Sequence, residues 1–254
     1  MKKFFQFILL LNLFICVDAK VIAQTKTFVI SYGANDAPPY AITDNHKLTS
    51  GIIKDLFDQL AQQLNITIEY VQTPRKRAEL YLNNGRIDAI AVSNPKWLAN
   101  SDSYQWSEPL FAEQDWLVTL TKKKKKITAI EQMKGMIIGT TRGYVYPKLS
   151  NYFTKNTIIR SDAKNLQANF KRLQLERLDG FIDADILINY YFQQHYSKTQ
   201  QREFSIEKVN ISQHYVHTAI SANSPVSASQ FNHALSQLKQ QGIIDTILKK
   251  YGIH

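Results

Sequence analysis

Hydrophobic positions along the chain follow two alternating periods. Short apolar runs at 27–33, 66–72 and 87–92 are typical of strands, whereas apolar residues at 50–65 recur at helical spacing. Ser50 stands just before that helical segment and is a candidate N-cap. Strands that alternate with helices in this way predict an α/β protein with a mostly parallel sheet.

The same rhythm restarts after the apolar run at 115–120. Further strands are expected at 136–141, 157–161 and 180–184, with a helix at 163–178, and the chain closes with two helices. The first of these C-terminal helices carries Phe231, Leu235 and Leu238 on one face and stops at Gly242, which fits a helix end.

Two segments of the chain echo each other. "LNNGRIDAIAV" (82–92) and "RLQLERLDGFID" (172–183) each end a helix, place an aspartate and open an apolar strand. The echo suits two similar α/β units joined in series.

The first residues predict export. Two lysines precede an apolar stretch at 4–17, and small residues follow at Ala19 and Ala23, the order of a secretory signal peptide. We expect the peptide to cover 1–23, with cleavage after Ala23 preferred to cleavage after Ala19. The apolar stretch is short for a membrane span, which needs ~20 residues, so an uncleaved anchor is the alternative.

The only cysteine, Cys16, lies within this predicted leader. The mature chain is therefore expected to have no disulfide, no thiol nucleophile and no cysteine metal site, and no cofactor is expected. No later stretch is apolar enough to span a membrane, so the sequence predicts a periplasmic protein that is not embedded in a membrane.

The chain is basic, with 31 Lys and Arg against 21 Asp and Glu and a formal net charge of +10. Five of the lysines form a run at 122–126. No aromatic residue interrupts the run and export separates the protein from nucleic acid, so no nucleic-acid partner is expected. A solvated surface loop is the interpretation, and a contact with anionic lipid or a partner protein stays open.

Five stretches in a fixed order resemble one known family. They are "ANDAPPYAITDNHKLTSGIIKDLFDQLAQQL" (34–64), "TPRKRAELYLNNGRIDAIAV" (73–92), "WSEPLF" (106–111), "ITAIEQMKGMIIGTTRGY" (127–144) and "LKQQGIIDTILKKYG" (238–252). In this order they resemble the family-3 extracellular solute-binding proteins, the periplasmic receptors of polar amino-acid ABC transporters.

The resemblance implies an α/β fold of two lobes, the type II Venus-flytrap arrangement, in which each lobe is a mostly parallel sheet flanked by helices. Lobe 1 is expected from 24–113 plus 212–254, and lobe 2 from 114–211. Such proteins close around one ligand between the lobes.

Loops after strands supply the first candidate residues, because α/β sheets bind ligands at the carboxyl ends of their strands. Asp36 is a candidate for a ligand ammonium, and Tyr40 either packs on the ligand or packs within its lobe. Arg75 and Arg77 lie near a helix start, where the helix dipole disfavours cations. Their partner is either a ligand carboxylate or a nearby acidic residue.

The third loop departs from the family. The resemblance implies an arginine there that grips the ligand's α-carboxylate, but ungapped alignment places Asn100 at that position and alignment on Pro95 places Trp97. Lys96 is near and offers only a point charge. Ser93 matches the family's hydroxyl position, and Trp97 is either a stacking platform or a packing residue.

The resemblance also implies a ligand-binding turn in the second lobe, where this chain has Arg142, Gly143 and Tyr144. Arg142 either replaces the missing carboxylate-binding arginine or forms a salt bridge between the lobes. Asp183 is preferred to Asp185 as the acidic residue that takes a ligand amine.

The resulting hypothesis is a non-enzymatic, monomeric binding protein. It captures a small polar solute that bears a carboxylate, and its partner is an ABC permease or a membrane sensor. One alternative is an exported cyclohexadienyl-dehydratase-like enzyme, with Asp183, Asp185 or Glu108 as the acid. Another is an accessory protein that binds no small molecule. His214 and His217 are close in sequence and are interpreted as surface residues rather than metal ligands.

Overall fold

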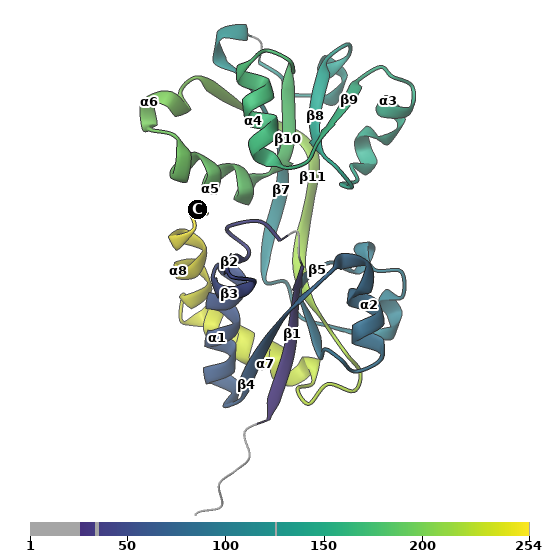
Figure 1. The fold of residues 1–254 in the computed structure, drawn as a ribbon, viewed down its shortest axis with the longest axis vertical. Helices are drawn as coiled ribbons and strands as arrows, with labels where there is room; N and C mark the ends of the chain where they lie inside the picture. Colours follow the sequence, from purple (N-terminus) through teal and green to yellow (C-terminus); the bar gives the residue numbers. More distant parts are fainter. Residues whose placement is uncertain (1–25, 34–35, 125, 254) are drawn as a thin grey trace, which may run out of the picture.

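The computed structural model describes residues 26–33, 36–124 and 126–253, so the predicted leader at 1–23 lies outside the described residues. Its elements form two lobes connected by two long strands (Figure 1). One sheet runs through both lobes, with the strand order β4-β1-β5-β11-β7-β10-β8-β9 and with β6 paired to β11. The α/β architecture of two lobes confirms the expected fold.

Lobe 1 is built on a parallel core of three strands, in which the central strand pairs with the other two. The strands of lobe 1 are β1 (Thr27–Gly33), β4 (Thr67–Thr73), β5 (Ala89–Ser93) and β6 (Gln105–Trp106), with a separate hairpin of β2 (Ile42–Asp44) and β3 (Lys47–Ser50). Its helices are α1 (Ile52–Leu64), α2 (Arg75–Asn83), α7 (Ala228–Gln240) and α8 (Ile243–Lys250), and the short 3-10 helices η1 (Pro95–Trp97) and η2 (Ser101–Ser103) follow β5.

Lobe 2 repeats this plan with another set of parallel strands. They are β8 (Ile137–Thr141), β9 (Ile159–Ala163) and β10 (Gly180–Ala184). The helices of lobe 2 are α3 (Ser150–Thr154), α4 (Leu166–Gln174), α5 (Asp185–His195) and α6 (Lys198–Gln201), with 3-10 turns η3 (Thr121–Lys123), η4 (Ile130–Met133) and η5 (Pro147–Leu149).

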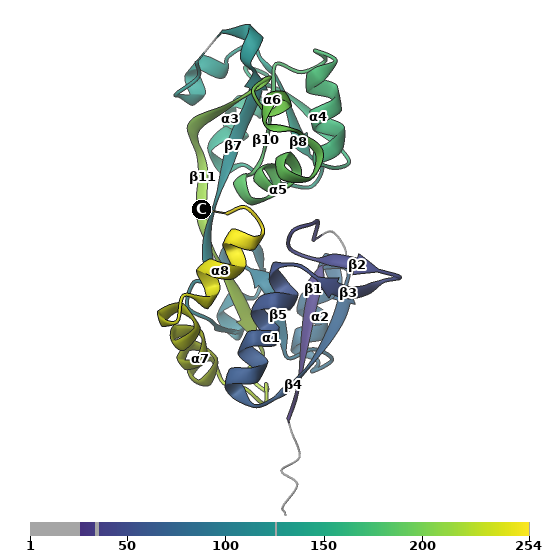
Figure 2. The same cartoon turned by 90° about the vertical axis from the view of Figure 1, so that its left-hand side faces the viewer.

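Two long antiparallel strands, β7 (Phe111–Leu120) and β11 (Phe204–Ile220), run from one lobe into the other (Figure 2). They pair over Phe204–Glu207 and again over Ser212–Val216, with a shift of register between Glu207 and Ser212. We call β7 and β11 the hinge strands. The lobe boundaries predicted at 113/114 and 211/212 fall within these strands and stay a prediction.

The two echoing segments form the same local structure in both lobes. In lobe 1, the Asp88 carboxylate accepts a hydrogen bond from the backbone N–H of Val29 at 2.8 Å. In lobe 2, the Asp179 carboxylate accepts one from the backbone N–H of Ile137 at the same distance. Each aspartate thereby fixes the strand that follows it to the first strand of its lobe.

Ser50 does not cap α1, which corrects the expectation from sequence. Ser50 ends β3, and Gly51 occupies the N-cap position with a φ of 114°. The backbone carbonyls of Pro39 and Tyr40 accept hydrogen bonds from the first N–H groups of α1, at 2.8 and 3.0 Å. A side-chain cap is unnecessary because these carbonyls satisfy the exposed donors. The same contacts hold Tyr40 in place beside the hinge strands.

Both lobes bury apolar cores, and the core of lobe 1 extends to Ala184, Ile186 and Leu187 of lobe 2. Phe28, Phe57 and Phe231 are fully buried in lobe 1, and Phe170 and Phe181 are fully buried in lobe 2. In the described part of the chain, no helix is long and apolar enough to cross a membrane.

Candidate functional site

Glu113 of β7 contacts a side chain of lobe 1 and a side chain of the other hinge strand. The hydroxyl of Tyr40, which is buried in lobe 1, donates a hydrogen bond to the Glu113 carboxylate. On the neighbouring strand, Nε2 of His214 lies 3.6 Å from the other carboxylate oxygen. That distance is too long for a hydrogen bond and corresponds to an ion pair when the imidazole is protonated. The neighbouring Glu113 carboxylate raises the pKa of His214 above its ordinary value, against the effect of partial burial.

A second carboxylate, Asp115, lies two residues further along the same strand. Its partner across the ladder is Ser212, whose hydroxyl donates a hydrogen bond to the carboxylate. Because Glu113 pairs with His214 and Asp115 with Ser212, all four side chains lie on one face of the hinge strands. Burial raises the pKa of Asp115 to about 6. The Ser212 hydrogen bond opposes this rise, and the Glu113 charge adds to it.

Lobe 2 contributes Asp183 at the end of β10. The carboxylate accepts hydrogen bonds at 3.0 Å from the Thr141 hydroxyl and from the backbone N–H of Ala184, and the residue is 1% exposed. Burial raises its pKa to about 7; the two hydrogen bonds oppose this rise, and the Asp115 and Glu113 charges add to it. At neutral pH this carboxyl group is therefore divided between its protonated and ionised forms.

Asp185 begins α5, where a carboxylate is favoured by the helix dipole. Its Oδ1 accepts hydrogen bonds from the N–H of Ile186 at 2.8 Å and from the N–H of Gln114 at 3.4 Å. The second contact ties lobe 2 to the hinge. Burial raises the pKa of Asp185, the two backbone hydrogen bonds lower it, and the Glu113 charge raises it further.

Lobe 1 contributes Asp36 from the loop after β1, Arg75 from the start of α2 and Trp97 from η1. Asp36 folds back onto β1, where the backbone N–H of Gly33 donates to its carboxylate at 2.7 Å. Burial raises the pKa of Asp36, and the nearby Arg75 guanidinium lowers it. The guanidinium lies 5.6 Å from the centre of the Trp97 ring, within cation–π range. The same ring meets His214 edge-on at 5.1 Å.

Tyr144 of lobe 2 completes the arrangement. Burial raises the pKa of its hydroxyl, and the charges of Asp183, Glu113 and Asp36 raise it further while Arg75 lowers it. The ring thus stands within electrostatic reach of groups from lobe 1, lobe 2 and the hinge. We call this set the interlobe cluster; it comprises Asp36, Tyr40, Arg75, Trp97, Glu113, Asp115, Thr141, Tyr144, Asp183, Asp185, Ser212 and His214.

Several residues predicted for the site lie apart from this cluster. Arg77 contacts the Tyr81 hydroxyl on its own helix, α2. Arg142 is exposed. Desolvation raises the pKa of Asp162 on β9, whereas the Arg142 charge is among the effects that lower it. Gly143 is exposed and has a φ of 86°, which explains the glycine at that turn.

The loop after β5 has mainly structural contacts. Ser93 is 2% exposed at the end of the strand, opposite His217 of β11. Lys96 is exposed, and Asn100 is exposed and uses its backbone N–H to bind Glu79. Trp97 is the residue of this loop that reaches the interlobe cluster.

Four hinge residues were not predicted from the sequence as site residues: Glu113, Asp115, Ser212 and His214. The structure contradicts the interpretation of His214 as a surface residue, because its side chain is only 23% exposed and faces Glu113. The available signal was two carboxylates spaced by two in "FAEQDWLVTL", which places them on one face of a strand. In the described part of the chain, no three His, Cys, Asp or Glu side chains are arranged so that they could hold a metal ion.

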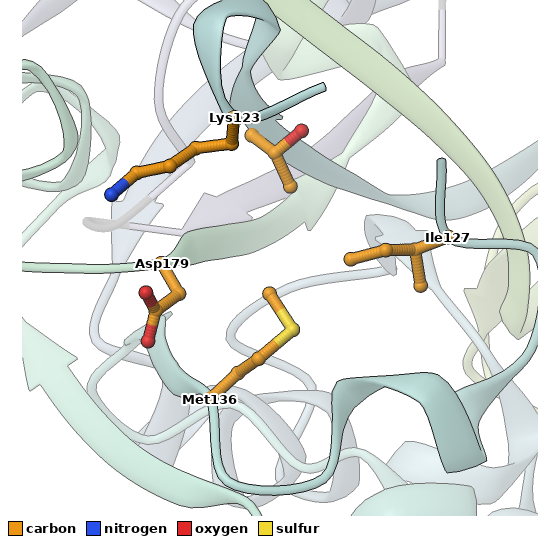
Figure 3. Close-up of a pocket in the computed structure, with 5 residues that line it drawn as sticks. Lys123, Ile127, Met136 and Asp179 are labelled. Atoms are coloured by element: carbon orange, nitrogen blue, oxygen red, sulfur yellow. The ribbon is translucent and has the colours of Figure 1, made fainter. Parts of the chain in front are cut away.

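A separate small pocket lies in lobe 2, lined by Thr119, Lys123, Ile127, Met136 and Asp179 (Figure 3). Lys122 and Lys123 of the lysine run form ion pairs with Glu176, at 2.5 and 3.2 Å. Lys122 and Lys123 are exposed, in agreement with the expected surface loop. Neither the pocket nor the lysine run belongs to the interlobe cluster.

Comparison with solved structures gives the same fold. The GluR0 ligand-binding core in complex with L-glutamate is 16% identical with a TM-score of 0.72, and the match covers 90% of this chain and 99% of that chain. Substrate-binding domain 2 of Lactococcus lactis GlnP, in an open conformation, is 16% identical with a TM-score of 0.67, covering 90% and 96%. The ancestral amino-acid-binding protein AncCDT-1, described as a precursor of cyclohexadienyl dehydratase, is 18% identical with a TM-score of 0.68, covering 89% and 95%.

A family model matches almost the whole described chain. It spans residues 30–254 and represents the bacterial extracellular solute-binding proteins of family 3. This match includes the loops, the hinge strands and the helices that carry the interlobe cluster. The chain belongs to the bacterial extracellular solute-binding proteins, family 3.

Proposed function

We propose that this protein captures a small polar solute between its two lobes and delivers it to an ABC permease or a membrane sensor, without catalysis. One observation carries the proposal: side chains from lobe 1, lobe 2 and both hinge strands meet in a single cluster of charged and aromatic groups. A solute held there contacts both lobes at once, which is how a two-lobe protein couples binding to closure. The predicted leader supports a location outside the cytoplasmic membrane.

Arg75 carries the guanidinium group of the cluster, and we propose that this group binds a carboxylate of the solute. It is exposed and no Asp or Glu among the described residues lies within ion-pair distance of it. Arginine binds carboxylates through two parallel hydrogen bonds. The guanidinium also lies 5.6 Å from the centre of the Trp97 ring, a cation–π contact that uses none of its hydrogen-bond donors.

The test begins with protein that has been unfolded in guanidinium and refolded to remove any solute that co-purified. A thermal-shift screen then covers amino acids, dicarboxylates, aromatic acids, polyamines and short peptides. A solute at 100 times its Kd adds about 2.7 kcal/mol to the free energy of unfolding, which is roughly 5–10 °C for a chain of this length. Arg75→Ala should weaken a carboxylate-bearing solute about tenfold or more, whereas the exposed Arg142→Ala serves as the matched control.

A dehydratase on the same fold is the second candidate, and one observation favours it. Asp183 has a pKa of about 7, so part of it is protonated at neutral pH, as a general acid requires. Against this, the residue is 1% exposed and its carboxylate is occupied by Thr141 and Ala184. Incubation with cyclohexadienyl acids should release no carbon dioxide above the uncatalysed rate, and release would favour the enzyme.

An accessory role without a small molecule is the remaining alternative. It predicts no thermal shift across the whole panel and no small molecule in mass spectra of the freshly purified protein. A co-purified solute would exclude it.

A further inference from the structure

The charge of the interlobe cluster is opposite to that of the chain. The whole chain carries +10. The cluster brings together five carboxyl groups and only two basic side chains, Arg75 and His214. The carboxyl groups are those of Asp36, Glu113, Asp115, Asp183 and Asp185. Carboxyl groups crowded in this way repel one another, and the Glu113 charge acts on each of the other four.

The hinge carboxylates keep acceptor capacity that the protein does not use. The Ser212 hydroxyl binds Oδ2 of Asp115, whereas Oδ1 of Asp115 accepts no hydrogen bond from any described residue. One oxygen of Glu113 accepts from Tyr40, and the other has His214 at 3.6 Å, beyond hydrogen-bond distance. An ionised carboxylate offers about four acceptor sites. These oxygens can therefore accept further N–H donors.

We propose that the solute is an organic cation, and that its ammonium or guanidinium group binds Glu113 and Asp115 on the face of the hinge strands that also carries Ser212 and His214. This inference rests on the proposed function, because it takes the interlobe cluster as the solute site. The hinge carboxylates then select for positive charge. Trp97 packs edge-on against His214, which faces Glu113, and Tyr144 lies within electrostatic reach of Glu113, so these two rings supply aromatic surface for the body of the cation.

Basic amino acids and diamines both carry a cationic group that the hinge carboxylates can bind. The effect of Arg75 on binding distinguishes the two classes. A basic amino acid has a carboxylate that requires Arg75 as well as the hinge carboxylates. A diamine has no carboxylate, so its binding depends on the hinge carboxylates alone and improves when the Arg75 charge is removed.

The experiment measures Kd by calorimetry for refolded protein with L-arginine, L-lysine, putrescine, L-glutamine and L-glutamate. We expect at least one of the three cations to bind tenfold or more tightly than glutamine and glutamate. Arg75→Ala should weaken a basic amino acid and strengthen putrescine. Binding of the cation at pH 6.5, measured in two buffers of different ionisation enthalpy, should release protons, since a bound cation favours the ionised carboxyl groups.

Neutral, nearly isosteric variants test the two carboxylates directly. Glu113→Gln and Asp115→Asn should each weaken the cation about tenfold or more. The matched controls are Glu108→Gln and Asp102→Asn, which change exposed carboxylates outside the cluster and should leave Kd within about twofold. The selectivity and proton release of the unmodified protein decide the question if either hinge variant fails to fold.

The inference fails if glutamine or glutamate binds as tightly as the best cation, or if folded Glu113→Gln and Asp115→Asn both retain the original Kd. It also fails if none of the five compounds binds. Mass spectrometry of freshly purified protein then separates the two proposals. A neutral or anionic solute would preserve the proposed function and overturn the cation, whereas no solute at all would count against both.

Discussion

Glu113 and His214 face each other across the two hinge strands, with Nε2 of the histidine 3.6 Å from Oε1 of the glutamate. The pair lies where the chain passes between lobes, and the buried Tyr40 hydroxyl holds the same glutamate from lobe 1. A titratable pair at this place makes both the stability of the protein and its response to a solute sensitive to pH.

His214→Gln should show this dependence. The pKa of His214 is raised in the folded protein, so its contribution to stability is fully present below its ordinary value of 6.5 and is lost as pH rises through the folded value. We expect the variant to lose about 0.5–1 kcal/mol at pH 5.5 and less at pH 8.5 in urea unfolding. His233→Gln, at an exposed position on α7, is the control, and an equal loss for His214→Gln at both pH values would contradict the prediction.

Asp183→Asn should reveal a pH dependence of the same sign that arises from a buried carboxyl group. Its pKa is raised from 3.8 to about 7, so the folded state prefers the protonated form and loses stability as pH rises from the ordinary value to the folded value, above which the loss levels off. Relative to the variant, the original protein should lose roughly 2 kcal/mol of unfolding free energy between pH 5 and pH 8.

Asp162→Asn is the control for that measurement. Hydrogen bonds from Thr140 and Arg160 outweigh desolvation and lower the pKa of Asp162, so it is ionised throughout this range. Its effect on stability should not change between pH 5 and pH 8. A flat difference for Asp183→Asn as well would show that Asp183 ionises at ordinary pH.

Tyr40→Phe removes the hydroxyl that joins lobe 1 to Glu113. Since that hydrogen bond goes to a carboxylate and Tyr40 is 8% exposed, the loss should be about 1–3 kcal/mol in urea unfolding. Tyr215→Phe is the matched control, because Tyr215 lies on β11 and is 56% exposed. A change within about 0.5 kcal/mol for Tyr40→Phe would mean that the contact contributes nothing.

Trp97→Phe should report directly on the solute. The chain has three tryptophans, and Trp97 is the one that contacts Arg75 and His214. A solute in the interlobe cluster should change tryptophan fluorescence in the original protein and in Trp106→Phe, and the change should be lost in Trp97→Phe. An undiminished signal in Trp97→Phe would place the solute away from this ring.

Asp88→Ala and Asp179→Ala test the structural repeat. Each removes the acceptor for one strand N–H, and each should cost about 0.5–1.5 kcal/mol, because neither hydrogen bond is fully buried and water can bind the donor in its place. Asp102→Ala, an exposed position in lobe 1, should stay within about 0.5 kcal/mol. Markedly unequal losses at 88 and 179 would show that the two lobes do not depend equally on the motif.

Most of the scaffold could be predicted from local patterns. Strands β1 and β10 coincide with the runs at 27–33 and 180–184, because alternating or continuous apolar residues fix strand identity locally. The junctions at Asp88 and Asp179 were visible as an echo for the same reason. The full length of β11 was not, because its polar half pairs with β7 only through contacts distant in sequence.

The site could be predicted only in part. Six predicted residues lie in the interlobe cluster, because each stands at or after the carboxyl end of a strand of a parallel sheet: Asp36, Tyr40, Arg75, Trp97, Tyr144 and Asp183. Arg77 and Arg142 follow strands too, yet their side chains point to partners within one lobe. Overall charge was a poor guide, because the basic residues are mostly on the surface and the cluster is acidic.

The position of Glu113, Asp115, Ser212 and His214 on the hinge strands has a mechanical consequence. A rotation of one lobe about these strands moves the far ends of the lobes through a long arc but displaces residues near the axis very little. A group bound to the hinge carboxylates would keep its contacts in open and closed forms alike. The charge of the solute would then be recognised before the lobes close. The loops far from the hinge strands would contact only a solute that the hinge carboxylates already hold.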